Sequence, residues 1–142
     1  MDVQIRRIDE TVPLPEYKTP GAVAMDCYVR ENVTILPQTI GYVGLNFALK
    51  IPTGYFILMA PRSSLHKRGL MLPNSVGIFD EDFSGDNDEY KVALYNFSQE
   101  TVEVKLGDRL TQIMLIPYEK IQLQEVDTLG ESGRGGFGTT GL

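Results

Sequence analysis

Short runs of apolar residues, either alternating with polar ones or continuous, dominate the chain. Thr101–Leu106 and Ile121–Gln124 alternate strictly, which is the pattern of half-buried strands. Tyr55–Met59, Tyr90–Phe97 and Ile113–Ile116 are strand-length runs rich in apolar residues, and we expect them to be core strands. The pattern predicts an all-β protein.

Glycine and proline interrupt these runs about every ten residues. The 14 glycines and 8 prolines leave no window for a helix longer than two turns. The short helix that the sequence favours covers Ser63–Arg68, with Ser63 as its N-cap. We therefore predict a single-domain barrel or jelly roll, extending over residues 1–128.

From Leu129 the composition changes, because six of the last 13 residues are glycine. Such a stretch cannot form a core of its own, so residues 129–142 are expected to form an arm. The arm contains the pattern G-x-G-x-x-G from Gly133 to Gly138. A dinucleotide-binding turn would need a helix after these glycines, and only four residues follow them. Phe137 and Arg134 suggest instead an arm that orders over a ligand, with backbone N–H groups available to phosphate.

The bulk composition is that of one globular domain of 142 residues, with 42% hydrophobic and 23% charged residues. No apolar run reaches 18 residues and the N-terminus lacks an apolar signal core, so neither a membrane span nor export is expected. The single cysteine, Cys27, favours the cytoplasm or another reducing intracellular compartment, nuclear and host-cell locations included. Its simplest role is that of a small buried hydrophobe.

The net charge of −6 argues against a nucleic-acid polymer as partner. Such binders use a basic stripe to displace counterions, and no stripe is visible. The net charge is compatible with a small phosphorylated ligand, because such a ligand needs only a few well-placed donors.

An acidic stretch, Asp80–Asp88, has oxygen ligands at alternate positions and a glycine at the sixth, like the start of an EF-hand loop. The twelfth position should be a bidentate glutamate and is Lys91. Flanking helices are not expected either. A solvated acidic hairpin is the simpler alternative.

Three further stretches carry groups that a nucleotide hydrolase could use. Pro61–Leu65 offers a guanidinium, two hydroxyls and N–H groups at a possible helix start, which together suit a phosphate. Gly107–Gln112 places a turn before a strand with a donor amide. Ala24–Tyr28 places the carboxylate of Asp26 in an apolar strand, where an ion needs a partner.

Taken singly, each of these stretches is more often structural. The arginines, Arg62 and Arg109, would then be ion-pair partners. The carboxylates, Asp26 and Asp108, would be turn or strand-end residues.

Together and in this order, the stretches resemble the five motifs of the trimeric dUTP pyrophosphatases (dUTPases), from about residue 20 to 141. The motifs are PGAVAMDCY, PRSSL, NSVGIFDEDFSG, GDRLTQI and GRGGFGTTG. The resemblance implies a jelly-roll-like β-barrel of the β-clip type and a homotrimer with three active sites at subunit interfaces. It also implies Mg²⁺-assisted hydrolysis of dUTP to dUMP and pyrophosphate, which limits uracil in DNA and supplies dUMP for thymidylate synthesis.

Residue roles follow from the resemblance by matching position. Asp80 would be the general base that activates water for in-line attack on the α-phosphate. Asp26 would hold Mg²⁺ through water, Phe83 would lie beneath the deoxyribose and exclude a 2′-hydroxyl, and Phe137 would close over the base. The implied substrate-binding residues are Arg62, Ser63, Ser64, Asn74, Gly77, Ile78, Phe79, Phe83, Lys91, Gln112, Arg134, Gly136, Phe137 and Thr139. Asn74 and the hairpin backbone after it would contact the uracil edge.

The chain departs from the family pattern at several positions. Arg134 is displaced by about two residues from the arginine of the fifth motif. Phe83 replaces the usual tyrosine and Ser64 the common glycine. Asp86–Glu89 resembles an insertion at a hairpin tip, with no function that the sequence indicates.

Two alternatives compete with a dUTPase. A dCTP deaminase would need a glutamate before the glycine that ends the third motif, where this chain has Ser84, and typically an arginine at Lys67. A binding protein without catalysis should have damaged motifs, yet Asp80 and Gln112 are intact. The only histidine, His66, is expected to be a surface residue.

Overall fold

The structure is a computed structural model that describes residues 1–136 and 138. This part of the chain holds eleven strands and one short 3₁₀ helix, η1 (Leu65–Arg68). The strands are β1 (Gln4–Arg7), β2 (Met25–Tyr28), β3 (Val33–Ile35), β4 (Ile40–Gly44), β5 (Phe47–Lys50), β6 (Tyr55–Pro61), β7 (Leu70–Met71), β8 (Gly77–Phe79), β9 (Lys91–Asn96), β10 (Val102–Val104) and β11 (Arg109–Pro117).

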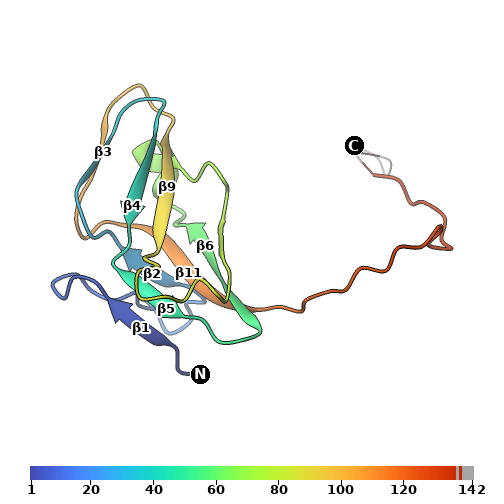
Figure 1. The fold of residues 1–142 in the computed structure, drawn as a ribbon. Helices are drawn as coiled ribbons and strands as arrows, with labels where there is room; N and C mark the ends of the chain where they lie inside the picture. Colours follow the sequence, from blue (N-terminus) through green and yellow to red (C-terminus); the bar gives the residue numbers. More distant parts are fainter. Residues whose placement is uncertain (137, 139–142) are drawn as a thin grey trace.

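The strands form four small antiparallel sheets that fold into a jelly-roll-like body (Figure 1). Their orders are β2-β11-β6-β8, β4-β9-β7, β1-β5 and β10-β3. Most neighbours in these sheets are distant in sequence, as a jelly roll requires. The prediction of an all-β, jelly-roll-like fold is confirmed.

The longest strand, β11, organises the sheet on which the candidate chemistry lies. It pairs with β2 along one edge and with β6 along the other. Gln112 of β11 is thereby directly opposite Asp26 on one side and Ala60 on the other. β8 continues the sheet beyond β6, with Ile57 opposite Phe79 and Met59 opposite Gly77.

An aromatic cluster fills the core beneath β8 and β9. The rings of Phe79 and Tyr90 stack with centroids 4.2 Å apart, and the centroid of the Phe47 ring lies 4.9 Å from that of Tyr90. Phe83 packs at 5.7 Å from both Phe79 and Tyr90. Cys27 is also fully buried, and burial raises the pKa of its thiol to about 12, so it behaves as a small hydrophobe.

Four of the predicted strands are confirmed: the runs Tyr55–Met59, Tyr90–Phe97, Thr101–Leu106 and Ile113–Ile116 contain or lie within β6, β9, β10 and β11. The prediction of a strand over Ile121–Gln124 is wrong. Ile121 is 80% and Leu123 86% exposed, and the chain leaves the body after β11 without meeting a sheet edge (Figure 1). An alternating pattern makes a strand only where another strand offers backbone partners.

The predicted helix start is also wrong. η1 begins at Leu65 with Ser64, not Ser63, at the N-cap, and neither hydroxyl caps it through a side-chain bond. The segment is a single tight turn that Gly69 ends in the left-handed conformation at φ 74°. The serine hydroxyls are exposed instead.

The segment Asp86–Glu89, for which the sequence indicates no function, has a structural role. The Glu89 side chain is only 10% exposed and accepts hydrogen bonds from Arg30 Nε at 2.7 Å and Nη2 at 3.1 Å. The backbone N–H of Asn46 donates to the same carboxylate. Glu89 therefore joins the β8–β9 connection to the ends of β2 and β4.

No helix in the part of the chain that the structure describes has the length and apolarity to cross a bilayer.

The hydroxyl of Tyr90 provides a test of the core. Within the described residues it is buried without a hydrogen-bond partner, and burial raises its pKa above the ordinary value. A buried hydroxyl without a partner costs free energy. We expect Tyr90→Phe to leave the free energy of unfolding unchanged or to raise it by up to about 1 kcal/mol, measured by urea denaturation. A loss of more than about 1 kcal/mol would show that the hydroxyl is satisfied.

Candidate functional site

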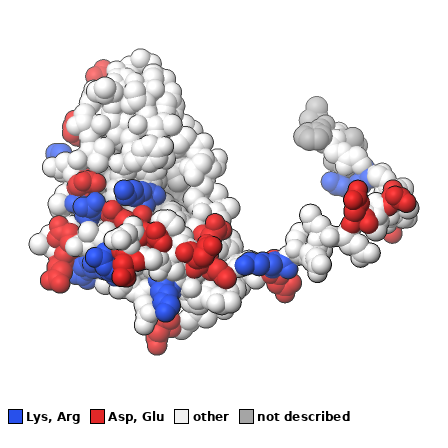
Figure 2. Space-filling model, viewed as in Figure 1, with Lys and Arg blue, Asp and Glu red and all other residues white. Residues whose placement is uncertain are grey.

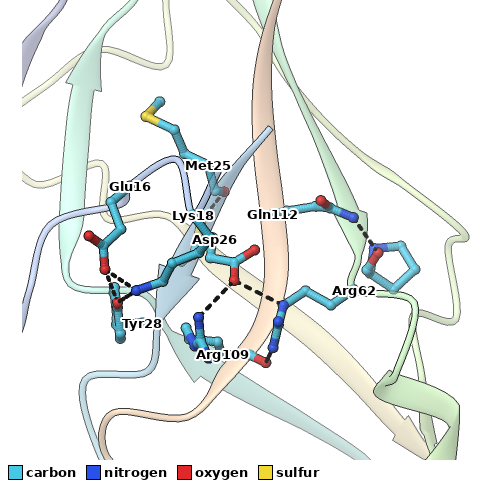
Figure 3. Close-up of polar contacts among 10 residues, drawn as sticks. Glu16, Lys18, Met25, Asp26, Tyr28, Arg62, Arg109 and Gln112 are labelled. Carbon is cyan, nitrogen blue, oxygen red and sulfur yellow. Dashed lines mark hydrogen bonds and ion pairs between the residues drawn. The ribbon is translucent and has the colours of Figure 1, made fainter. Parts of the chain in front are cut away.

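A polar cluster covers one face of the β2-β11-β6 sheet (Figure 3). Side chains alternate between faces along a strand. Because Cys27 points into the core, Asp26 and Tyr28 point to the opposite face. This alternation places a nearly buried carboxylate beside residues of β11 and the end of β6.

A bulge in β11 brings two polar side chains to the same face. Arg109 and Gln112 are three residues apart, so a regular strand would place them on opposite faces. The register against β2 shifts between Arg109 and Thr111, and both Leu110 and Thr111 are buried. The extra residue redirects Arg109 to the face of Gln112 and Asp26.

Asp26 is held between two guanidinium groups. Its Oδ2 lies 3.0 Å from Arg62 Nε and 3.2 Å from Arg109 Nη1. Arg62 Nη1 also donates to the backbone oxygen of Arg109 at 3.1 Å. The expectation that Asp26 needs an ionic partner is confirmed, and two cations against one carboxylate leave this group with an excess of one positive charge.

A second ionic group lies beside the first one. Lys18 Nζ and the Tyr28 hydroxyl both donate to the Glu16 carboxylate, and Lys18 also lies 2.6 Å from the Tyr28 oxygen. The ammonium of Lys18 lowers the pKa of Glu16. This group is charge-neutral, so the positive excess remains at Arg62 and Arg109.

The predicted phosphate-binding residues Arg62, Ser63, Ser64 and Gln112 come together here. The amide of Gln112 donates to the backbone oxygen of Pro61 at 3.0 Å, next to Arg62. Ser63 and Ser64 follow directly and are exposed. We call Asp26, Arg62, Ser63, Ser64, Arg109 and Gln112 the anion seat. Sequence reasoning did not place Arg109 in it, because the bulge has no signature in the sequence.

The remaining hairpin residues form a separate group around β8. Ile78 is 64% exposed, and Asp80 is exposed on an open pocket of about 480 Å³ that Phe56, Tyr118 and Lys120 also line. A Cβ on Gly77 would lie 3.1 Å from the Phe79 ring, so a larger residue would strain this packing. Asn74 belongs to the turn before β8 and is exposed, while the Phe79 and Phe83 rings pack against the core.

One chain does not bring this hairpin group to the anion seat. Phe79 is opposite Ile57, so Asp80 lies level with Phe56, six residues along β6 from Arg62. At about 3.3 Å per residue the separation is roughly 20 Å. That exceeds the span of a triphosphate.

The other predicted residues lie elsewhere. Lys91 is exposed on β9, opposite Gly44 of β4. Arg134 and Gly136 are exposed on the extended C-terminal segment. Phe137 and Thr139 lie outside the described residues. His66 is exposed, as expected for a surface residue. Within residues 1–136 and 138 no three His, Cys, Asp or Glu side chains cluster as a metal site would need.

Known proteins resemble this chain over nearly its whole length. The dUTPase family model matches residues 10–141. The deoxyuridine 5′-triphosphate nucleotidohydrolase of Finegoldia magna is 40% identical, covering 91% of this chain and 92% of its own. The same enzyme of Dictyoglomus turgidum is 38% identical, covering 99% and 98%.

Solved dUTPase structures also resemble this chain. The crystal structure of dUTPase from Streptococcus mutans has a TM-score of 0.77 at 28% identity, over 83% of this chain and 98% of its own. The dUTPase of Staphylococcus bacteriophage 80alpha with dUpNHpp has a TM-score of 0.87 at 19% identity, over 99% of both chains.

The shared carboxylate can be tested by a double-mutant cycle. We expect Asp26→Asn and Arg109→Gln to show a coupling free energy of about 0.5–3 kcal/mol in urea unfolding, because each removes the same ion pair. Protein concentration is held fixed. The control pair, Asp26→Asn with Glu103→Gln on the β10-β3 sheet, should be additive within about 0.5 kcal/mol. Additivity of the first pair would contradict the interaction.

Proposed function

The chain belongs to the dUTPase family, and on this premise we propose that it hydrolyses dUTP to dUMP and pyrophosphate. Such an activity limits uracil incorporation into DNA and supplies dUMP for thymidylate synthesis. The observation that carries the proposal is the anion seat, where Arg62, Gln112 and two serine hydroxyls surround a local excess of positive charge.

The anion seat would hold the triphosphate. Phosphoryl transfer depends on neutralising charge and placing the reactants in line. The guanidinium of Arg62 is held by Asp26 through Nε and by the Arg109 backbone oxygen through Nη1, and these two contacts fix its plane. A fixed guanidinium plane is suited to binding two phosphate oxygens at once.

Asp80 would act as the general base. Its carboxylate is exposed at the end of β8, where it could accept a proton from the attacking water. A base positioned in this way contributes roughly 10²–10⁴ in rate. The rest of the acceleration would come from orientation and from electrostatics in a site closed to water.

The hairpin around β8 would select the nucleoside. Asn74 and the backbone of Gly77, Ile78 and Phe79 would bind the uracil edge. Phe83 would lie beneath the deoxyribose, and its ring is fixed by contacts with Phe79 and Tyr90. Because the Phe83 ring is held in place by these contacts, it would leave no room for a 2′-hydroxyl on the sugar. UTP would therefore be excluded.

The site would be shared between copies of the chain in a homotrimer. The separation of Asp80 from the anion seat supports this, since one chain alone cannot place both groups on one triphosphate. An apolar row also crosses the β4-β9-β7 sheet, where Ile40, Tyr95 and Met71 are neighbours and Tyr42 lies 71% exposed. Figure 2 shows this upper part of the body almost free of charged side chains, as expected for a surface that another copy covers.

Mg²⁺ is the expected cofactor, and the residues present fit it. Within the described residues, the side chain of Asp26 contacts its partners through Oδ2. Its Oδ1 could therefore accept a hydrogen bond from a metal-bound water. Magnesium held mainly by phosphate and water needs few protein carboxylates. When bound, it would neutralise phosphate charge. The dUTPase of phage phi11 is described with a structural Mg(II) ion.

The C-terminal arm, residues 129–142, would close over the site. Phe137 would cover the base, while Arg134, Gly136 and Thr139 would bind phosphates and Lys91 would line the substrate. The segment leaves the body in extended form (Figure 1), so it is long enough to extend towards another copy.

We also propose that the protein acts in a reducing intracellular compartment, because it has a single cysteine, and that it binds no nucleic-acid polymer, because its net charge is −6.

Deamination of dCTP is the less favoured chemistry. Ser84 stands where a deaminase needs glutamate, and its hydroxyl donates to the Glu81 backbone at 2.6 Å and accepts from Ile51 N at 3.0 Å. Those bonds give Ser84 a structural role.

The proposed activity is tested by pyrophosphate release from dUTP, dCTP, UTP and dTTP with Mg²⁺. We expect release from dUTP, with rates at least about 10²-fold lower for the other three. Asp80→Asn should retain binding of a non-cleavable dUTP analogue and lose about 10²–10⁴ in turnover. Turnover near the wild-type rate would reject Asp80 as the base, and ammonia release from dCTP would reject the activity.

The shared site is tested by mixing two inactive variants. Asp80→Asn and Arg62→Ala chains are co-refolded in equal amounts, and we expect roughly a quarter of wild-type activity, from sites that combine the intact halves. The control mixture of Arg62→Ala with Gln112→Ala should stay inactive, because every anion seat then carries a defect. No recovery in the first mixture would place the whole site within one chain.

A further inference from the structure

Glu81, the residue after the proposed base, ties three segments together. Its Oε2 accepts hydrogen bonds from the backbone N–H of Gly54 at 2.9 Å and from the Tyr118 hydroxyl at 2.7 Å. The ammonium of Lys120 lies 3.9 Å from Oε1. We call these four residues the Glu81 clamp. It joins the loop before β6 and the start of the C-terminal segment to the loop that carries Asp80.

The clamp acts at the turn that Asp80 begins. Phe83 N donates to Asp80 O at 3.0 Å, which closes a four-residue turn with Glu81 as its second residue. The Ser84 hydroxyl donates to the Glu81 backbone oxygen. Both the backbone and the side chain of Glu81 are therefore fixed, and the Asp80 Cα is one peptide bond away.

The three consecutive acids of this turn differ in their surroundings. Asp80 and Asp82 are exposed, whereas the Glu81 side chain is 26% exposed. The hydrogen bond from Tyr118, and then that from Gly54, lower the pKa of Glu81, while Glu81 raises the pKa of Tyr118. All three acids line the open pocket, but Glu81 is held there as a carboxylate by its contacts with Gly54, Tyr118 and Lys120.

The strand pairing does not hold Asp80 by itself. β8 ends at Phe79, and in the described part of the chain its pairing with β6 ends there too. Beyond this point the path of the loop depends on the turn and on the Glu81 clamp. An error of about 1 Å in the placement of a catalytic group can cost about 10² in rate.

We propose that Glu81 is a positioning residue for Asp80, and that it acts by anchoring the Asp80 turn to the root of the C-terminal segment at Tyr118. This inference rests on the proposed function. The anchor sets where the Asp80 carboxylate lies. It should matter less for substrate affinity, because β8 is held by its pairing with β6, the Phe83 ring is held by Phe79 and Tyr90, and the groups that would bind the triphosphate lie at the other end of β6.

Tyr118→Phe removes the hydroxyl and keeps the ring, its edge contact with Phe56 and its backbone bond to Gly54. We expect kcat for dUTP to fall about 10-fold, with KM changed less than about twofold. The matched control is Thr34→Val, which removes a hydroxyl that donates to the Glu103 carboxylate at 2.9 Å on the β10-β3 sheet. The control should leave kcat unchanged.

Two substitutions of Glu81 separate geometry from charge. Glu81→Asp keeps the charge but is too short to reach both donors, so kcat should fall as in Tyr118→Phe. Glu81→Gln keeps an acceptor for both donors and should retain most of the wild-type kcat. Circular dichroism and melting curves show whether each variant is folded.

The result that overturns the proposal is a folded Tyr118→Phe or Glu81→Asp variant whose kcat stays within about twofold of the wild type. A rise in KM at unchanged kcat, or a Glu81→Gln variant as slow as Glu81→Asp, would overturn it as well. These outcomes require a wild-type protein that hydrolyses dUTP. A wild type inactive towards dUTP refutes the proposed function itself, and the two failures are therefore distinct.

Discussion

The carboxylate of Asp26, nearly buried between two guanidinium groups, is the interaction on which the functional surface depends. A charge in that position is tolerated only when paired, and Arg62 and Arg109 provide the pairing from two different segments. Their joint attachment to one oxygen joins β2, β11 and the end of β6 at a single point. The same attachment leaves one positive charge in excess, and this excess is the basis of the proposal that an anion binds there.

The sheet that carries the anion seat also explains why the proposed site needs more than one chain. β6 begins beside Asp80 and ends beside Arg62, so the strand separates the proposed base from the proposed phosphate-binding groups by nearly its full length. Rigid pairing on both edges prevents the strand from bending to close this distance. The proposed assembly of several copies would meet the requirement without distorting any of them, and the apolar surface on the β4-β9-β7 sheet would provide area for it.

Different interactions hold the two parts of the proposed site, the anion seat and the hairpin around β8. In the anion seat, the bulge at Leu110 and the shared carboxylate orient the side chains. In the hairpin, aromatic packing fixes Phe79 and Phe83 from below, and the Glu81 clamp holds the turn from the side. The Asp80 turn therefore lies between the aromatic core and the start of the extended C-terminal segment.

The sequence by itself determined the all-β, jelly-roll-like class, the core strands over β6, β9, β10 and β11 and the residues of each motif, because alternation, turn residues and motif spacing are local properties. It did not reveal that Ile121–Gln124 lacks a partner strand among the described residues, or that Arg109 shares the face of Asp26. Those facts depend on register, on a bulge and on the presence of a sheet edge. Each of them is fixed by residues distant in the chain, so only the tertiary structure decides them.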